Sequence, residues 1–272
     1  MQARTLWRPP TGPLGRLTTL ARERAAALGS ERDWASRAAE SDTVMSLPSA
    51  LRWGSVGVIA EVKRRSPSKG SLNDSIDAPL RARQYHDGGA RAISVLTEPS
   101  EFGGANEDLV EVRRLVSCPL LKKDFHVHPV QMFEARVYGA SAALLIVRAL
   151  GPDDTRLLAD AARQAGVEPV FEVRDEAELA TAIDARAAVI GVNRRNLETL
   201  DFEPAVLVRL LPIVPPTIIA VAESGISTRA DVEEVAALGA DAVLVGSALS
   251  TALDVHQAVA QLTGVERMSR RG

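Results

Sequence analysis

The sequence has little of several features that define whole classes of protein. It contains one cysteine, Cys118, in 272 residues, which excludes a disulfide framework and zinc sites built from cysteine alone. Its longest apolar run, residues 142–147, ends at Arg148 and is far shorter than the ~20 residues that span a bilayer. Residues 1–30 contain prolines and arginines but no apolar core, so we expect no secretory signal peptide.

Aromatic content and net charge are also low. Aromatic side chains make up 4% of the chain and the formal net charge is -3 at pH 7, which argues against a nucleic-acid partner. The remaining composition, 46% hydrophobic and 25% charged, is typical of a soluble globular protein. We therefore expect a cytoplasmic enzyme or binding protein for a small molecule, with neither nucleic acid nor membrane as partner.

From residue 56 onward, short β-branched runs alternate with segments of helical spacing. Apolar strands that alternate with helices form a parallel sheet covered on both faces. Eight such units between residues 56 and 264, about 26 residues each, predict an α/β fold, the (β/α)8 TIM barrel. An open doubly wound sheet is the alternative, but the first run lacks its glycine-rich turn. The predicted strands are 56–62, 92–97, 119–125, 142–147, 167–173, 187–192, 217–222 and 240–245.

Short extensions flank the predicted barrel. Apolar residues from Leu17 to Leu28 have helical spacing, and Ser30 with Asp33 resembles the capping box that starts a second helix. We expect this extension to pack across one end of the barrel, and the arginine-rich C-terminal tail to be a solvated end. The predicted organisation is a helical extension at 1–55, a catalytic barrel domain at 56–264 and a basic tail at 265–272.

Polar side chains gather at the carboxyl ends of the predicted strands, where TIM barrels carry their chemistry. Each could be a surface residue or a structural ion pair, but charges at apolar strand ends are costly unless they pair or function. Carboxylates that face lysines can hold the shifted pKa values that general acids and bases need. No histidine belongs to the set, so we expect no metal. Its members are Glu61, Lys63, Lys123, Glu172, Asn193, Arg195 and Glu223.

Two turns of glycine and serine follow the last two predicted strands. They are Ser224-Gly225 and Gly246-Ser247. A glycine next to a serine after a strand is often a simple turn. In TIM barrels, however, the backbone N–H groups of the loops after the last two strands form the usual phosphate site. Together they predict that the ligand carries a phosphate.

Residues 58–70, VIAEVKRRSPSKG, resemble the signature of the indole-3-glycerol-phosphate synthase family. Further similarity lies in residues 94–98, 123–125, 144–147, 171–173, 190–197 and 222–226. The resemblance implies a carboxy-lyase of tryptophan biosynthesis without cofactor or metal. Its reaction closes 1-(2-carboxyphenylamino)-1-deoxyribulose 5-phosphate to indole-3-glycerol phosphate, with loss of carbon dioxide and water.

The resemblance also implies roles for individual residues. Lys123 would protonate the ketone oxygen as the ring carbon attacks, and Glu172 would be the base for dehydration. Lys63 would neutralise the substrate carboxylate and could share the acid role. Orientation of the sugar hydroxyls and lysines falls to Glu61, Asn193 and Glu223. The implied substrate-binding residues are Ser66, Phe102, Phe125, Arg195, Ser224, Gly225, Gly246 and Ser247.

Several positions depart from the family pattern. Ala248 stands in place of a serine, Ser141 in place of an aspartate, and Arg148 where many members have a small residue. Because residues 1–50 diverge most, a substrate derived from a modified anthranilate is one alternative. Ser66 has an alternative to substrate contact, since it could be a turn residue beside Pro67.

Two other functions compete with the synthase. Phosphoribosylanthranilate isomerase shares the fold, but the isomerase family uses a cysteine and an aspartate as its acid–base pair. Cys118 lies before the strand at 119–125, at the amino end, whereas TIM barrels carry their chemistry at the carboxyl ends. A catalytically silent scaffold would be expected to lack Lys123 or Glu172, and both are present. We expect a small-molecule phosphosugar as the substrate, and a monomer or weak homodimer.

Overall fold

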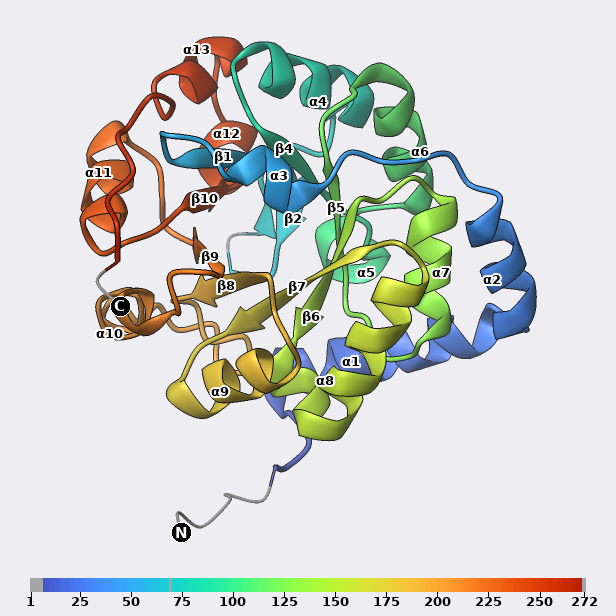
Figure 1. The fold of residues 1–272 in the computed structure, drawn as a ribbon. Coiled ribbons are helices and arrows are strands. Elements are labelled where there is room, and N and C mark those ends of the chain that lie inside the picture. The colour runs from blue at the N-terminus through green and yellow to red at the C-terminus, as the bar shows by residue number, and fades with distance from the viewer. Residues whose placement is uncertain (1–6, 69, 271–272) are drawn as a thin grey trace, which may run out of the picture.

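The computed structural model describes residues 7–68 and 70–270 and contains a closed parallel barrel (Figure 1). β1 pairs with β4 on one side and with β10 on the other, which closes the ring. This confirms the predicted TIM barrel. Six strands lie within their predicted runs, and β8 and β9 each extend one residue past theirs, to Asn193 and Glu223. The strands are β1 (Gly57–Val62), β4 (Ala92–Leu96), β5 (Leu120–Lys123), β6 (Ala142–Ile146), β7 (Glu168–Val173), β8 (Val189–Asn193), β9 (Ile219–Glu223) and β10 (Ala242–Val245).

Helices connect successive strands and surround the barrel (Figure 1). Several begin at an aspartate or threonine whose side chain accepts a backbone N–H of the first turn, as Asp77, Asp175 and Thr228 do. No helix among the described residues is long and apolar enough to cross a membrane. The main connecting helices are α4 (Ala78–Asp87), α6 (Asn106–Leu115), α7 (Val130–Val137), α8 (Val147–Gln164), α9 (Glu176–Asp184), α10 (Ala205–Leu210), α11 (Arg229–Ala237) and α13 (Val255–Ala260).

Four short elements modify this regular pattern. A hairpin of β2 (Arg65–Ser66) and β3 (Gly70–Ser71) follows β1. The one-turn helices α5 (Pro99–Phe102) and α12 (Ser247–Ser250) follow β4 and β10, and the 3-10 helix η1 (Leu211–Ile213) follows α10. The first three extend loops at the carboxyl ends of strands, so they lie on the side of the barrel where the site was predicted.

The N-terminal extension covers both ends of the barrel, not one. Helix α1 (Gly12–Ala27) packs Leu14 and Leu17 into the same buried cluster as inward-facing strand residues. Helix α3 (Leu47–Leu51) closes the opposite end, where a Cβ on Gly57 would lie 2.9 Å from Leu51. Between them, α2 (Glu31–Ala39) starts at Ser30, whose hydroxyl accepts the N–H of Asp33 as predicted.

The C-terminal tail is docked on the barrel, so the expectation of a solvated end is wrong for Arg267 and Arg270. Both guanidinium groups lie 2.8 Å from the carboxylate of Asp241, just before β10. The side chains of Arg270 and Asp241 are each only 3% exposed. Arg270 also donates to the backbone carbonyl of Ile218 at 2.6 Å. A buried carboxylate needs such partners, since an uncompensated buried charge is strongly destabilising.

Candidate active site

The predicted catalytic residues converge at the carboxyl ends of the strands. Lys123, Asn193 and Glu223 are the last residues of β5, β8 and β9. Side chains two or four apart along a strand share a face. Lys123 and Glu223 therefore follow the inward-facing Leu121 and Val221, and Asn193 lies four residues after Val189 of the same buried cluster. Neighbouring strands also bring Asn193 into register with Glu223. The alternation seen in the sequence therefore places these side chains inside the barrel mouth.

Lys123 and Glu172 form the central pair of the site. The Lys123 Nζ lies 3.4 Å from the Glu172 Oε2, and both side chains are largely buried. Burial by itself lowers the pKa of Lys123, but the charges of Glu172, Glu223 and Glu61 outweigh it and hold that pKa above its ordinary value. Lys123 is therefore a stably charged ammonium group in a pocket of carboxylates.

Glu223 is a second carboxyl group in contact with this pair. Burial raises its pKa well above the ordinary value, and the charge of Glu172 and a hydrogen bond to it act in the same direction. Lys123 opposes this shift. Two carboxyl groups at such close range favour holding one proton between them. The Glu223 Oε1 is buried and has no protein partner among the described residues.

Glu61 and Lys63 form a second ion pair at the mouth. Their Oε1 and Nζ atoms lie 2.8 Å apart. A Cβ on Gly246 would lie 2.3 Å from the Glu61 Oε1, so this glycine leaves the space that the pair occupies. Gly191 does the same for Glu223, whose Oε1 would lie 2.0 Å from a Cβ there. Both glycines are required by carboxylates on neighbouring strands.

The expected phosphate loops lie beside these pairs. Ser224 has a left-handed φ of 68°, and its hydroxyl donates to the Asn193 Oδ1 at 2.8 Å. Gly246 caps α12, of which Ser247 is the first residue. Arg195 donates to the backbone carbonyl of Leu200 at 2.8 Å. Its guanidinium is thus turned toward the loop that follows β8.

The remaining predicted binding residues lie around the same mouth. The rings of Phe102 and Phe125 have centres 6.3 Å apart, and both pack on the barrel-interior cluster. Ser66 is buried in the β2–β3 hairpin, directly after the loop that carries Lys63.

Sequence reasoning missed an arginine on α1 that reaches into this region. The Arg24 Nη2 lies 2.6 Å from Asp124, the residue after Lys123, and its Nη1 lies 3.4 Å from Glu98. Glu98 in turn accepts the backbone N–H groups of α5, including that of Phe102. Adjacency of Asp124 to Lys123 is visible in the sequence, but nothing local identifies Arg24, because the contact spans a hundred residues.

Arg148 connects the N-terminal segment to the mouth instead of lying free in it. It forms two hydrogen bonds of 2.9 Å with Glu198, and Glu198 also accepts the N–H of Thr11 at 2.8 Å. The strand predicted at 142–147 ends at Ile146, and Arg148 lies in the first turn of α8. Its charge is thus compensated by Glu198 and anchors the chain before α1.

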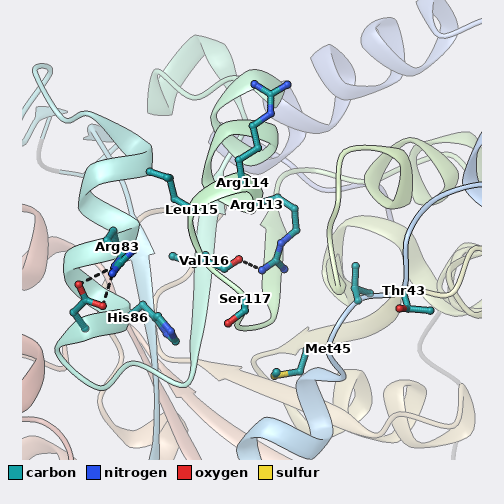
Figure 2. Close-up of a pocket in the computed structure, with 11 residues that line it drawn as sticks. Thr43, Met45, Arg83, His86, Arg113, Arg114, Leu115, Val116 and Ser117 are labelled. Carbon is teal, nitrogen blue, oxygen red and sulfur yellow. Dashed lines mark hydrogen bonds and ion pairs between the residues drawn. The ribbon is translucent and has the colours of Figure 1, made fainter.

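The structure has one small hollow at the mouth and a larger one at the other end of the barrel. A cavity of about 20 Å³ is lined by Leu14 of α1 together with Glu172 and Asn193. A larger groove of about 590 Å³ lies at the other end of the barrel, beside the ends of α4 and α6 (Figure 2). Figure 2 shows Arg113 turned toward the carbonyl of Val116, where it caps the end of α6. No group of three metal-ligating side chains is found among the described residues.

Comparison with known proteins identifies the family. A family model described as indole-3-glycerol phosphate synthase matches residues 17–262. The protein of that name from Mycobacterium sp. (strain KMS) is 46% identical over 247 residues, covering 91% of this chain and 90% of that protein. The one from Rhodococcus opacus (strain B4) is 48% identical over 225 residues, covering 83% and 84%.

Solved structures resemble the chain in fold alone. A 3-hexulose-6-phosphate synthase from Salmonella typhimurium superposes with a TM-score of 0.62 at 16% sequence identity, covering 76% of this chain and 96% of that chain. The family model, by contrast, covers most of the sequence. The strand-end residues of this chain that resemble the family meet in one barrel mouth. The chain belongs to the indole-3-glycerol phosphate synthase family.

Proposed function

We propose that this chain is an indole-3-glycerol-phosphate synthase, a carboxy-lyase that closes the ring of 1-(2-carboxyphenylamino)-1-deoxyribulose 5-phosphate. The observation that carries the proposal is the Lys123–Glu172 pair, 3.4 Å apart at the end of the barrel. A charged lysine beside a carboxylate supplies both the acid and the base that condensation and dehydration need. Membership of the family supports the same reaction.

Lys123 acts as the acid of the first step. The ring carbon that bears the carboxylate forms a bond to the ketone carbon, and the carbonyl π electrons move to oxygen. Lys123 gives this oxygen a proton. The carboxylates around Lys123 raise its pKa, so it is fully protonated beforehand, and the developing alkoxide is basic enough to take the proton.

Glu172 acts as the base of the last step. Carbon dioxide leaves the ring carbon, and its bonding electrons restore the conjugated ring system. Glu172 then removes a proton from the carbon beside the ring nitrogen, and the electrons of that C–H bond form the new ring double bond. The hydroxyl group on the adjacent carbon leaves as water with a proton donated by one of the two lysines, Lys63 or Lys123. Glu223, Glu61 and Asn193 keep the two lysines and the sugar hydroxyls oriented.

Binding of the substrate follows from the charges and rings at the mouth. Lys63, held by Glu61 at 2.8 Å, neutralises the ring carboxylate, and Ser66 lies on the adjoining hairpin. Phe102 and Phe125 flank the aromatic ring. The loops at Ser224-Gly225 and Gly246-Ser247 take the phosphate through backbone N–H groups, with Arg195 nearby.

We infer that loops at the mouth shift to admit the substrate. The hollow lined by Leu14, Glu172 and Asn193 is only about 20 Å³, so a substrate needs more room on this side of the mouth. Polar contacts at the rim, among them Arg16–Glu101, are partly exposed, and such contacts open at low cost.

The test offers the purified protein two substrates in parallel. We expect the carboxyphenylamino-deoxyribulose phosphate to give an indole product, and phosphoribosylanthranilate to remain unchanged. Conversion of the second compound alone would establish the isomerase in place of the synthase. Folded protein that converts neither, including ring-substituted analogues of the first, would favour the scaffold.

We also infer a cytoplasmic location and a monomer or weak homodimer. The single cysteine suits a reducing compartment, and every catalytic residue of the proposed site comes from one chain. Sedimentation velocity across a range of concentrations tests the oligomeric state, and a tight higher oligomer would contradict it.

A further inference from the structure

A buried arginine outside the predicted site lies against one of the expected phosphate loops. Arg194 follows directly after β8 and is 9% exposed. Its Nε donates to the backbone carbonyl of Ser224 at 2.8 Å. Its guanidinium lies 4.7 Å from the centre of the Phe202 ring. The side chain is therefore held between an aromatic face and the loop after β9.

The bond to Ser224 fixes the orientation of one peptide group. In a trans peptide the C=O and the N–H point in opposite directions, and the carbonyl of Ser224 shares its peptide with the N–H of Gly225. Holding that oxygen toward Arg194 therefore turns the Gly225 N–H away from Arg194. Within the described part of the chain, no backbone or side-chain acceptor takes the Gly225 N–H, which leaves it available to a ligand.

The loop needs this support because its backbone is strained. Ser224 and Gly225 both have left-handed φ values, of 68° and 72°, and a residue other than glycine adopts that region at a cost. Asn193 holds the Ser224 hydroxyl at 2.8 Å, so two consecutive residues of one strand end hold Ser224. The packing is tight as well, since a Cβ on Gly225 would lie 2.5 Å from the ring of Phe202.

We propose that Arg194 is a positioning residue for phosphate recognition. By holding the Ser224–Gly225 peptide, it directs the Gly225 N–H at the substrate phosphate before the substrate arrives. A preoriented donor spares the ordering cost that a freely turning peptide would incur on binding. This inference rests on the proposed function through the assignment of the phosphate loop, and it gives a role to a residue that the sequence motif did not single out.

The test measures phosphate binding apart from turnover. Inorganic phosphate and anthranilate, a ring probe without phosphate, are titrated into the unaltered protein, Arg194→Ala and Arg194→Lys. Lysine keeps the charge but lacks the Nε–H donor. In both variants we expect the Kd for phosphate to rise about tenfold or more, while the Kd for anthranilate stays within about twofold because the ring site is separate. In turnover, KM for the phosphorylated substrate should rise more than kcat falls.

Arg229→Ala is the matched control. This arginine is half-exposed at the start of α11 and pairs with Glu233, so phosphate binding should not change. The inference is overturned if Arg194→Ala binds phosphate as tightly as the unaltered protein, or if Arg194→Lys restores binding completely. Should Arg194→Ala fail to fold, Arg194→Lys and Arg194→Gln carry the test. The inference about Arg194 is also overturned if the unaltered protein binds no phosphate. That result would leave the proposed function standing, because ring closure is measured separately.

Discussion

At the scale of single residues, the two lysines of the site have different surroundings. Lys63 pairs with one carboxylate, Glu61, at 2.8 Å. Lys123 lies 3.4 Å from Glu172, and the charges of Glu172, Glu223 and Glu61 all raise its pKa. The charged form of Lys123 is therefore favoured again after it has given up a proton, which suits a turnover role. Lys63 is better placed as a fixed positive charge for the substrate carboxylate.

Glu223→Gln should stabilise the protein increasingly as pH rises. The pKa of Glu223 is raised in the folded state by burial and by Glu172, so the folded protein binds this proton more tightly than the unfolded chain does. Its contribution to stability is then lost as pH rises from the ordinary carboxyl pKa of about 4.3 toward the folded value. Glutamine cannot ionise and avoids this loss.

Thermal unfolding of Glu223→Gln and the unaltered protein between pH 5 and 8 measures the effect. We expect the Tm of the variant to exceed that of the unaltered protein by a margin that grows with pH, with each kcal/mol worth about 2–4 °C. Ring closure should slow at the same time, because a catalytic group is lost. A margin that is constant with pH would show that Glu223 titrates normally in the folded protein.

The site residues that lie on strands could be predicted from the sequence. Strand periodicity puts Glu61, Lys123 and Glu223 on the inward face, and the structure does the same. The space-making role of Gly191 could not be predicted, because the carboxylate that needs the space comes from the next strand. The orientation of Arg195 was equally hidden, since its acceptor belongs to a nonlocal turn at Leu200.

At the scale of elements, α1 is fastened across the mouth by polar contacts at both of its ends. Thr11 binds Glu198 at 2.8 Å, and Arg24 bridges Asp124 and Glu98. The side chains of Asp124 and Glu98 are almost fully buried, at 6% and 0% exposure. Arg24 therefore ties a helix outside the barrel to the residue next to Lys123.

Arg24→Ala should reduce both stability and catalysis. It leaves two buried carboxylates without a cation, which costs about 3–5 kcal/mol in a fully buried pair and less here because Arg24 is partly exposed. Loosening of Asp124 and α5 should lower kcat/KM by about tenfold or more, since small displacements of catalytic groups are costly. Steady-state kinetics and thermal unfolding measure the two effects.

The matched control is Arg22→Ala on the same helix. Arg22 is exposed, so its removal should change neither quantity appreciably. Equal kinetics for the two variants would show that α1 does not influence the site through Arg24.

The elements themselves were largely predictable, with informative exceptions. All eight strands follow from apolar runs because parallel strands are buried on both faces. The β2–β3 hairpin was missed since it has two residues in each strand and no periodicity to detect. Ser141, which departs from the family pattern, accepts the N–H of Leu120 at 3.2 Å, as Asp241 accepts that of Ala220 at 2.8 Å. A short polar acceptor before the strand is what this position requires.

At the scale of the whole molecule, the two ends of the barrel have separate tasks. The carboxyl ends of the strands carry the candidate site, while α3 and the C-terminal tail close the opposite end. The tail was misjudged from sequence because a run of arginines is usually solvated. Its acceptor, Asp241, lies before β10, and only the closed ring brings the two together.

Deletion of residues 267–272 should therefore lower stability without impairing catalysis. It removes both arginines from Asp241 and leaves a buried carboxylate with its backbone partner alone. We expect the Tm to fall by roughly 10 °C, corresponding to about 3–5 kcal/mol. At a temperature where both proteins are folded, kcat should be unchanged within about twofold, because the tail is remote from the mouth. A large loss of kcat with an unchanged Tm would contradict this separation.

The most direct test of the central claim is the fluorescence of the indole product, followed in chelator-treated buffer with unaltered protein and with Lys123→Ala. The account predicts a rise with the unaltered protein, and less than about a tenth of that rate with the variant, since loss of a general acid costs about 10²–10⁴-fold. Circular dichroism of the variant should show that it remains folded. Retention of more than a tenth of the activity by folded Lys123→Ala would contradict the assignment of the Lys123–Glu172 pair as the catalytic centre.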